Sequence, residues 1–169
     1  MDIIVDKSGM LAWNAGDAEH RVRCSLGRGG IGNKEGEGDG ITPLGTFPLR
    51  AVMVRTDRVG LPETRLPVSK IMDNDGWCDD PDDPDYNTRI SLPHSASHEK
   101  LSRDDHLYDV IVEVGYNDDP IVSGRGSAIF MHLARENYTP TEGCVGLALE
   151  DMIKLLENCD GETRLVVKE

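Results

Sequence analysis

The chain has 169 residues, which is the size of one ordinary domain that can bury its own core. Its 31 acidic residues against 18 basic ones give a formal net charge of −13, and no basic stripe interrupts this balance. A nucleic-acid partner is therefore disfavoured, because binding a phosphate backbone requires clustered positive charge. We expect a single domain over residues 1–169 that acts as a monomer.

The N-terminus carries no basic leader followed by an apolar stretch, and no segment is apolar over the length of a membrane-spanning helix. We therefore expect a cytoplasmic protein with no membrane partner, although a periplasmic protein whose signal had been removed would read the same. The four cysteines form no Cys-x-x-Cys pair, so we expect reduced thiols rather than a disulfide frame or zinc ribbon: Cys24, Cys78, Cys144 and Cys159.

Short strands separated by turns are predicted along most of the chain. The strand patterns cover residues 2–6, 11–13, 20–26, 47–55, 107–114, 127–132 and 163–167. A single amphipathic helix is predicted over residues 147–158, and Gly161 is a plausible stop.

Residues 72–105 are acidic, punctuated by proline and rich in turn residues. We expect a long irregular loop here. Loops of this length inside a compact domain are uncommon and often act as a lid or binding loop, and a solvated insertion is the alternative.

Three patterns resemble ligand motifs without predicting a ligand. Residues 27–32 fit Gly-x-Gly-x-x-Gly, but the Gly-rich stretch that follows cannot open the apolar-faced helix of a dinucleotide site, so we expect a flexible hairpin loop. Residues 73–76 resemble the start of a calcium loop, yet Pro84 occupies the position that needs a bidentate Glu. His94 and His98 match no metalloprotease pattern and are predicted to be surface residues. No metal site and no cofactor are predicted.

The pattern that indicates chemistry is His132 placed twelve residues before Cys144. A thiol whose proton a histidine can accept is the starting point of a cysteine acyl-transfer enzyme. We expect Cys144 in the connection between the strand ending at His132 and the helix beginning at Leu147, where neighbouring amides can face a substrate oxygen. A buried structural thiol is the alternative, but the small polar residues before Cys144 favour a nucleophile.

Two separate segments resemble the YkuD-type L,D-transpeptidase family. His132 followed by residues 141–145, Thr-Glu-Gly-Cys-Val, is similar to the family's upstream His and its Ser/Thr-His-Gly-Cys-Ile/Val element. Residues 38–47, Gly-Asp-Gly-Ile-Thr-Pro-Leu-Gly-Thr-Phe, resemble its Asp-Gly-x-Thr-Pro-x-Gly-x-Phe turn. The resemblance spans most of the chain and implies a mainly β fold, a YkuD-like β-sandwich with a helix following the catalytic cysteine.

The resemblance also implies a role for each residue of the site. Cys144 would be the thiolate nucleophile, and His132 would be its base and the later proton donor. The backbone carbonyl of Leu133 would orient the histidine, and the backbone N–H groups of Gly143 and Cys144 would form the oxyanion hole. Pairing with an imidazolium would depress the pKa of the thiol.

Two positions depart from the family pattern, with Glu142 in place of His and Gly146 in place of Arg or Asn. A carboxylate beside a thiolate disfavours the charged sulfur, so we expect Glu142 to point away or to engage Arg135 or the ammonium of a substrate. Thr141, Glu142 and Arg135 are candidate substrate-binding residues. Four residues of the long loop are candidates to floor or close the cleft, with plain packing as the alternative: Trp77, Tyr86, Asn87 and Arg103.

The substrate that the resemblance implies is a peptidoglycan stem peptide or muropeptide, cut before its terminal D-alanine through an acyl-enzyme. Without an export signal we expect soluble muropeptides, where water competes with no fixed acceptor strand. An L,D-carboxypeptidase of peptidoglycan recycling is therefore favoured, with L,D-transpeptidation as the alternative. A non-catalytic module that binds peptides or cell-wall fragments, and a metal-dependent peptidase, are alternatives of other classes.

Overall fold

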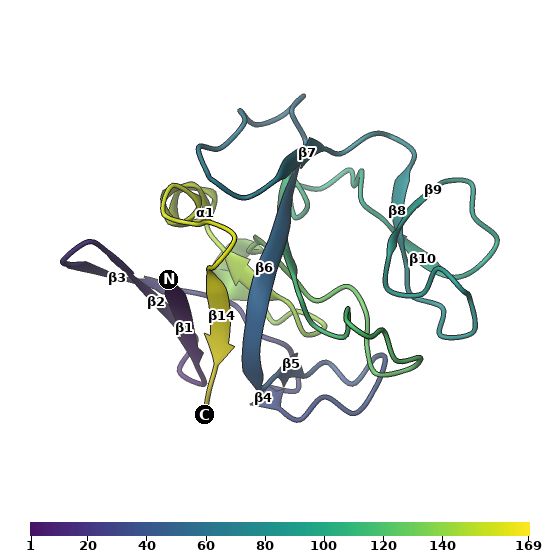
Figure 1. Cartoon of the computed structure of the whole chain (residues 1–169), viewed down its shortest axis with the longest axis horizontal. Coiled ribbons are helices and arrows are strands. Elements are labelled where there is room, and N and C mark those ends of the chain that lie inside the picture. Colours follow the sequence, from purple (N-terminus) through teal and green to yellow (C-terminus); the bar gives the residue numbers. More distant parts are fainter.

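The computed structural model describes residues 1–169 and shows a mainly β fold with one α-helix (Figure 1). The strands are β1 (Asp2–Asp6), β2 (Met10–Ala15), β3 (Ala18–Arg23), β4 (Ile31–Gly32), β5 (Thr42–Pro43), β6 (Gly45–Val54), β7 (Val68–Lys70), β8 (Asp75–Cys78), β9 (Arg89–Ser91), β10 (His98–Lys100), β11 (Val110–Val114), β12 (Phe130–Leu133), β13 (Val145–Leu147) and β14 (Arg164–Val167). The helices are α1 (Leu149–Leu156) and a 3-10 turn, η1 (Glu136–Tyr138). Neither has the length and apolarity needed to span a lipid bilayer.

One long strand, β6, organises the main sheet. Its first half pairs with β14 and its second half with β11 and β7, so the strand order runs β13-β12-β11-β6-β14-β1-β2-β3. The first and last strands, β1 and β14, are parallel neighbours, so the N-terminus lies at the start of this strand pair and the C-terminus at its other end (Figure 1). The predicted mainly β fold with a helix after the cysteine is confirmed.

The strands β6, β11 and β12 carry a different core on each face. Because neighbouring side chains of a strand point to opposite faces, Val52 and Val54 join one apolar cluster while Met53 joins the other. The larger cluster has 23 buried residues and includes Met152 and Leu156 of α1, so the helix covers this face. The smaller cluster has 10 residues and contains Cys144, which places the cysteine on the opposite face from the helix.

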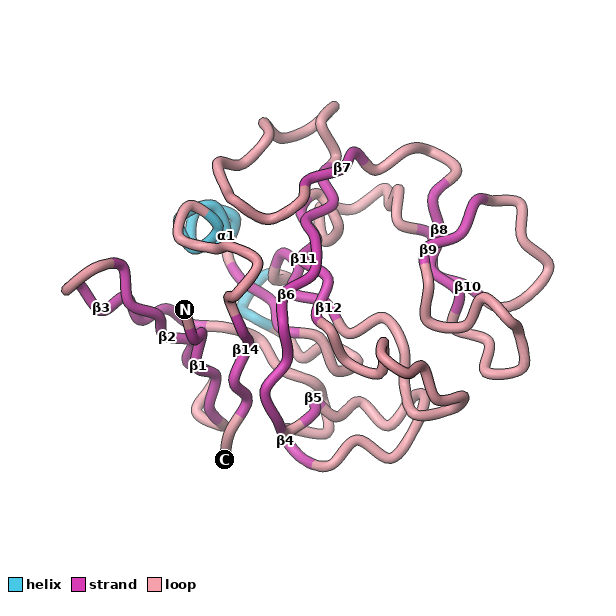
Figure 2. The backbone as a smooth tube through the Cα atoms, viewed as in Figure 1, coloured by secondary structure: helices cyan, strands magenta, loops and turns pink.

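The segment from 72 to 105 is not the irregular loop that its composition predicts. It contains a three-stranded sheet in the order β10-β8-β9, and Figure 2 shows these short strands within loops on the side of the molecule away from α1. Each strand has only three or four residues, and turn residues such as Asp, Pro and Ser flank it. A strand this short shows no recognisable alternation of apolar and polar residues in the sequence. Trp77 and Leu101 anchor this sheet to the smaller core cluster.

Two other elements differ from the prediction. The helix begins at Leu149, and residues 145–147 form strand β13, because their apolar run merges with the helical pattern that follows and periodicity alone cannot separate the two. Cys144 therefore lies between two strands rather than between a strand and a helix. Residues 27–32 are also not a free hairpin loop, since β4 pairs in parallel with β5.

Candidate active site

Strand pairing places Cys144 and His132 on the same face of the sheet. β12 and β13 are parallel and aligned so that Met131 lies opposite Val145 and His132 opposite Gly146. Cys144, one residue before β13, therefore lies level with Phe130, and the backbone N–H of Phe130 donates to its Sγ over 3.4 Å. Because Phe130 and His132 are two residues apart in one strand, their side chains share a face.

The thiol of Cys144 is held inside the protein. Its residue is only 8% exposed, and Sγ donates a hydrogen bond to the carbonyl oxygen of Ala128 over 3.2 Å. Burial, reinforced by the negative charge of Glu99, raises the pKa of the thiol to about 12. The resting sulfur is therefore protonated at neutral pH.

His132 is oriented by its own strand. Its Nδ1–H donates to the carbonyl oxygen of Leu133 over 2.8 Å, which leaves Nε2 as the nitrogen that can accept a proton. Burial lowers the pKa of the imidazole to about 4, because a charged ring would lose its hydration. The Tyr108 and His132 rings form a T-shaped pair with centroids 5.4 Å apart.

The two groups are thus neutral rather than the thiolate and imidazolium pair that the family resemblance implies. Desolvation accounts for both shifts, since it disfavours the negative sulfur and the positive ring alike. A neutral imidazole is nevertheless the form that can act as a general base. These pKa values favour transfer of the proton from Cys144 to His132 during attack on a substrate rather than before it.

The turn before the cysteine requires glycine. Gly143 has φ +133°, and a Cβ at this position would lie 2.8 Å from the carbonyl oxygen of Ile41. Its N–H donates to Oγ1 of Thr141 over 3.1 Å, while the hydroxyl of Thr141 donates to the carbonyl of Cys144 over 2.6 Å. The N–H of Cys144 makes no hydrogen bond within the protein, so it is the free one of the two amides predicted for the oxyanion hole.

The Gly-rich segment, residues 27–32, contacts both the Asp-Gly-x-Thr-Pro turn of residues 39–43 and the turn that precedes Cys144. The N–H of Gly27 donates to Oγ1 of Thr42, and the N–H of Arg28 donates to the carbonyl of Thr141, each over 2.8 Å. A Cβ on Gly27 would collide with the carbonyl oxygen of Gly40. Gly27 and Gly29 of the Gly-x-Gly-x-x-Gly pattern therefore allow close backbone packing, and this packing supports the cysteine turn.

The carboxylate of Asp39 holds the loop of residues 34–41 together. Its carboxylate accepts hydrogen bonds from Lys34 Nζ over 2.6 Å and from the N–H groups of Ile41 and Glu35, each over 2.9 Å. Burial opposes ionisation of Asp39, but these donors, with the N–H of Gly36, outweigh it and hold its pKa at about 2. The aspartate of the family turn is thus a positioning residue for the loop that reaches the cysteine.

The two departures from the family motif have structural explanations. Glu142 pairs with Arg28 Nε over 2.8 Å, and both side chains are exposed, so the carboxylate faces solvent and Arg28 rather than the expected Arg135. A Cβ on Gly146 would collide with Oγ of Ser25, whose N–H donates to the carbonyl of Gly146 over 2.9 Å. A side chain at position 146 would require the hydroxyl of Ser25 to move.

Cys144 and His132 open into one polar cavity of about 350 Å³. Side chains of both charges line it, with Lys34, Arg103 and Arg135 positive and Glu37, Asp79, Glu99 and Glu142 negative. Three of these, Asp79, Glu99 and Arg103, come from residues 71–109 between β7 and β11, a segment that we call the insertion. The insertion therefore builds one wall of the cavity.

The candidate substrate-binding residues divide into two groups. Thr141, Glu142, Arg103 and Arg135 line the cavity, whereas Trp77, Tyr86 and Asn87 do not. These three are buried and form internal contacts. The indole N–H of Trp77 donates to Oδ1 of Asn87 over 3.0 Å, and the hydroxyl of Tyr86 bonds Glu37. The expectation that Trp77, Tyr86 and Asn87 form the floor of the cleft is therefore wrong. They lie behind the residues that line the cavity and support them.

Several cavity residues carry no signal in the sequence. Tyr108 donates to Oε2 of Glu99 over 2.6 Å, and burial raises the pKa of Glu99 despite this bond. Glu99 belongs to a three-residue strand within the acidic segment, so no spacing distinguishes it from its neighbours. The pairing of β10 with β8 is what carries it to the cysteine face.

Cys144 and His132 open into one charged cavity. A thiol beside a histidine that can accept its proton is the arrangement of a cysteine acyl-transfer enzyme, and this is the class of protein that the site indicates. The sequence profile of the L,D-transpeptidase catalytic domain, YkuD, matches residues 1–167. The chain belongs to the YkuD family of L,D-transpeptidase catalytic domains. The resemblance expected from the two motifs is thereby confirmed. The chain has no significant match among curated protein sequences.

Two solved structures that are similar to this chain are longer than it. The helical cell shape determining protein Pgp2 from Campylobacter jejuni is 14% identical with a TM-score of 0.51, and the match covers 99% of this chain and 47% of Pgp2. Bd1075 of Bdellovibrio bacteriovorus is 16% identical with a TM-score of 0.48, covering 98% of this chain and 46% of Bd1075. The chain thus spans about half the length of these proteins, and the likeness to Pgp2 concerns the fold alone.

Proposed function

We propose that the protein is an L,D-carboxypeptidase that releases the terminal D-alanine from the tetrapeptide stem of a muropeptide, acting on soluble fragments in the cytoplasm. The observation that carries the proposal is the single cavity that holds Cys144 and His132 together with charges of both signs. A stem peptide offers matching groups, since its diamino acid carries an ammonium and a carboxylate and its last residue ends in a carboxylate.

The acylation step follows from the hydrogen bonds of the site. The sulfur of Cys144 attacks the carbonyl carbon of the diamino acid while its proton passes to Nε2 of His132. The free N–H of Cys144 is available to the oxyanion of the tetrahedral intermediate. His132 then returns the proton to the nitrogen of D-alanine, which leaves as the C–N bond breaks. A thioester to Cys144 remains.

Deacylation decides between the two activities of the family. In hydrolysis, water gives one proton to His132 and its oxygen attacks the thioester carbon, and the thiol of Cys144 is regenerated when the C–S bond breaks. A cavity of about 350 Å³ lies at the small end of ligand pockets, which supports a site for one peptide end rather than for two stems. Water needs no further binding surface, so this small volume favours hydrolysis.

The positive residues suggest how the terminal carboxylate is recognised. Arg135 makes no ion pair within the protein, and its guanidinium is free for a ligand. Arg103, in contrast, is held by a bidentate contact with Asp105, at 2.8 and 2.7 Å. We therefore assign Arg135 to the substrate carboxylate, and Glu37, Asp79 and Glu99 to the ammonium of the diamino acid.

The test is mass spectrometry of a disaccharide tetrapeptide containing meso-diaminopimelate, incubated with the protein in ¹⁸O-water with and without D-methionine. Hydrolysis incorporates one ¹⁸O atom into the new carboxylate of the tripeptide and releases D-alanine. Transpeptidation instead yields a tetrapeptide ending in D-methionine with no ¹⁸O. Cys144→Ala is the negative control, and Cys159→Ala controls for loss of a buried thiol away from the cavity.

Dominant ¹⁸O-tripeptide that depends on Cys144 supports the carboxypeptidase. Dominant exchange with D-methionine would make the protein an L,D-transpeptidase and overturn the proposal. Binding of the muropeptide without any Cys144-dependent product would favour the non-catalytic module instead. Cell fractionation followed by immunodetection tests the proposed cytoplasmic site of action, and recovery in the periplasm would contradict it.

A further inference from the structure

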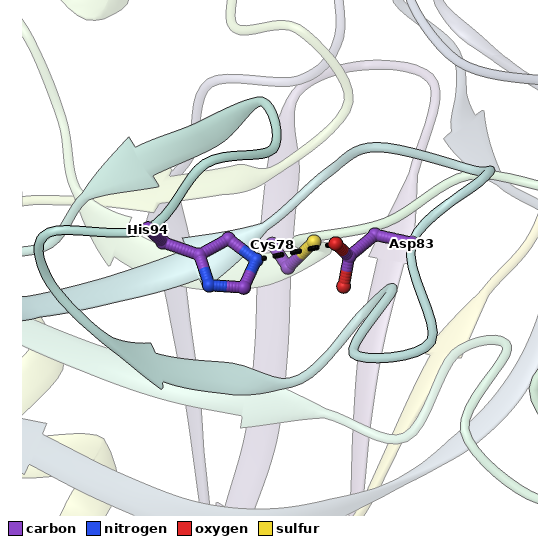
Figure 3. Close-up of side chains that lie close together, drawn as sticks. All are labelled: Cys78, Asp83 and His94. Carbon is purple, nitrogen blue, oxygen red and sulfur yellow. Dashed lines mark ion pairs between the residues drawn. The ribbon is translucent and has the colours of Figure 1, made fainter.

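A cluster of three different donor groups lies in the inserted segment, outside the catalytic cavity. Sγ of Cys78, a carboxylate oxygen of Asp83 and a ring nitrogen of His94 all lie within 4.8 Å of one another. Figure 3 shows the thiol, the carboxylate and the imidazole turned toward a common point. Cys78 is fully buried, and the other two are partly buried.

The spacing within the cluster does not suit a hydrogen bond. Nε2 of His94 lies 3.4 Å from Oδ2 of Asp83, beyond the usual range for a hydrogen bond, and this buried nitrogen has no hydrogen-bond partner. Two ligand atoms that each lie about 2.1 Å from a tetrahedral zinc ion are separated by roughly 3.4 Å. His94 and Asp83 form an ion-pair contact in this structure, drawn as a dashed line in Figure 3, and its length matches the separation expected between two ligands of one ion.

The carboxylate of Asp83 is arranged to give one oxygen to a ligand. Its Oδ1 accepts the N–H of Asp85 over 2.9 Å in a local turn, and this leaves Oδ2 facing His94. The loop from Asp79 to Asp85 also carries five aspartates, so the local potential favours a cation.

We propose that Cys78, Asp83 and His94 form a binding site for a divalent transition metal of the zinc class. Thiolate, imidazole and carboxylate together are ligands that such an ion prefers, whereas calcium and magnesium take oxygen ligands. On binding, the thiol of Cys78 loses its proton to solvent and the sulfur coordinates the ion. The fourth position of a tetrahedral site is then left to water.

The place of the cluster indicates what the ion does. It ties the end of β8 to the following acidic loop and to the segment between β9 and β10, and so closes the insertion upon itself. Asp79, next to Cys78, lines the catalytic cavity, and Glu99 lies opposite Trp77 in the β8 and β10 pair. The metal is therefore a structural clamp for the wall of the cavity that the insertion builds.

The experiment is a titration of the full chain with Co²⁺ in the Cys144→Ala background, which removes the catalytic thiol as a competing ligand. A thiolate bound to Co²⁺ produces a charge-transfer absorption in the near ultraviolet, and we expect it to saturate at one ion per chain. Cys78→Ser should abolish the band, and His94→Gln should weaken binding at least tenfold. Zn²⁺ should displace Co²⁺ and remove the band.

Two matched controls keep these variants interpretable. His20→Gln removes a histidine on β3, and Cys159→Ser removes a thiol bonded to the carbonyl of Leu155, so both should leave the titration unchanged. Circular dichroism of each variant establishes that it is folded before the titration is read.

A second measurement needs no variant within the cluster. X-ray absorption at the zinc edge should show one sulfur at about 2.3 Å and nitrogen or oxygen scatterers at about 2.0–2.2 Å. Absence of a saturable Co²⁺ band, a band that survives Cys78→Ser in folded protein, or a zinc shell without sulfur would each overturn the proposal.

Discussion

The two faces of the central sheet differ in what they bury. On the helix face, 23 buried residues form one apolar cluster into which α1 inserts Met152, Leu155 and Leu156. On the cavity face, an apolar cluster of 10 residues adjoins groups that titrate, namely the buried Cys144 and His132 and the partly buried Glu99. The first face stabilises the fold, whereas the second holds polar groups whose burial opposes folding in their charged forms.

A single strand serves both faces. In β12, Met131 and Leu133 belong to the helix-face cluster, while Phe130 joins the smaller cluster on the opposite face and His132 lines the cavity there. The helix-face residues fix the position of the strand, and the strand in turn positions the imidazole and the donor to Cys144. Changes on the helix face should therefore act on stability, and changes on the cavity face should act on chemistry.

The largest effect is expected from Cys144→Ala, which should reduce release of D-alanine by about a thousandfold or more, because no other thiol opens into the cavity. Cys159→Ala, on the helix face, should lower the unfolding free energy but leave kcat within about twofold. D-alanine released per minute and chemical denaturation measure the two outcomes. Substantial turnover by Cys144→Ala would break the division between the faces.

On the helix face, Met152→Ala should lower the unfolding free energy by about 3 kcal/mol, because it leaves a cavity at a fully buried position. Leu149→Ala in the same helix is the matched control, since its side chain is 40% exposed and should cost less than about 1 kcal/mol. Urea denaturation measures both. Equal costs for the two variants would show that α1 does not anchor the core as described.

The pH dependence of stability should report the buried imidazole. The pKa of His132 is about 4 in the folded protein against an ordinary value of 6.5, so the unfolded chain binds more protons between these values. The contribution of neutral His132 to the unfolding free energy is therefore fully present above pH 6.5. It falls by about 3 kcal/mol as the pH is lowered toward 4. Urea denaturation across this window should give a shallower loss for His132→Gln. Equal slopes would show that His132 is not a buried neutral base.

The sequence predicts the helix face better than the cavity face. The strand over residues 2–6 is found with the predicted bounds, and the predicted helix contains α1, because apolar periodicity reports burial against a core. The strands of the insertion fall outside this signal, since they are short and gain their stability from pairing with one another and from the anchor residue Trp77.

At the site, contacts between residues far apart in the chain could not be predicted from the sequence. The motifs single out Cys144 and His132, but the pairing of Glu142 with Arg28 joins segments far apart in the chain. The charge state of the thiol depends on desolvation by the whole fold, which no local pattern encodes. The same reason hides the Cys78 cluster, because its ligands have no motif spacing and are joined by the turns of the insertion.

The smallest expected effect on the cavity face comes from the negative charge of Glu99, which raises the pKa of the Cys144 thiol. After burial, Glu99 is the main cause that raises the pKa of Cys144, so Glu99→Gln should lower this pKa while keeping an acceptor for the hydroxyl of Tyr108. Alkylation by iodoacetamide, followed by mass spectrometry as pH rises, should then reach its half-maximal rate at lower pH. Glu142→Gln is the matched control and should leave the profile unchanged, because Glu142 faces Arg28 and solvent. A shift with Glu142→Gln but not with Glu99→Gln would mean that the motif departure, rather than the insertion, controls the nucleophile.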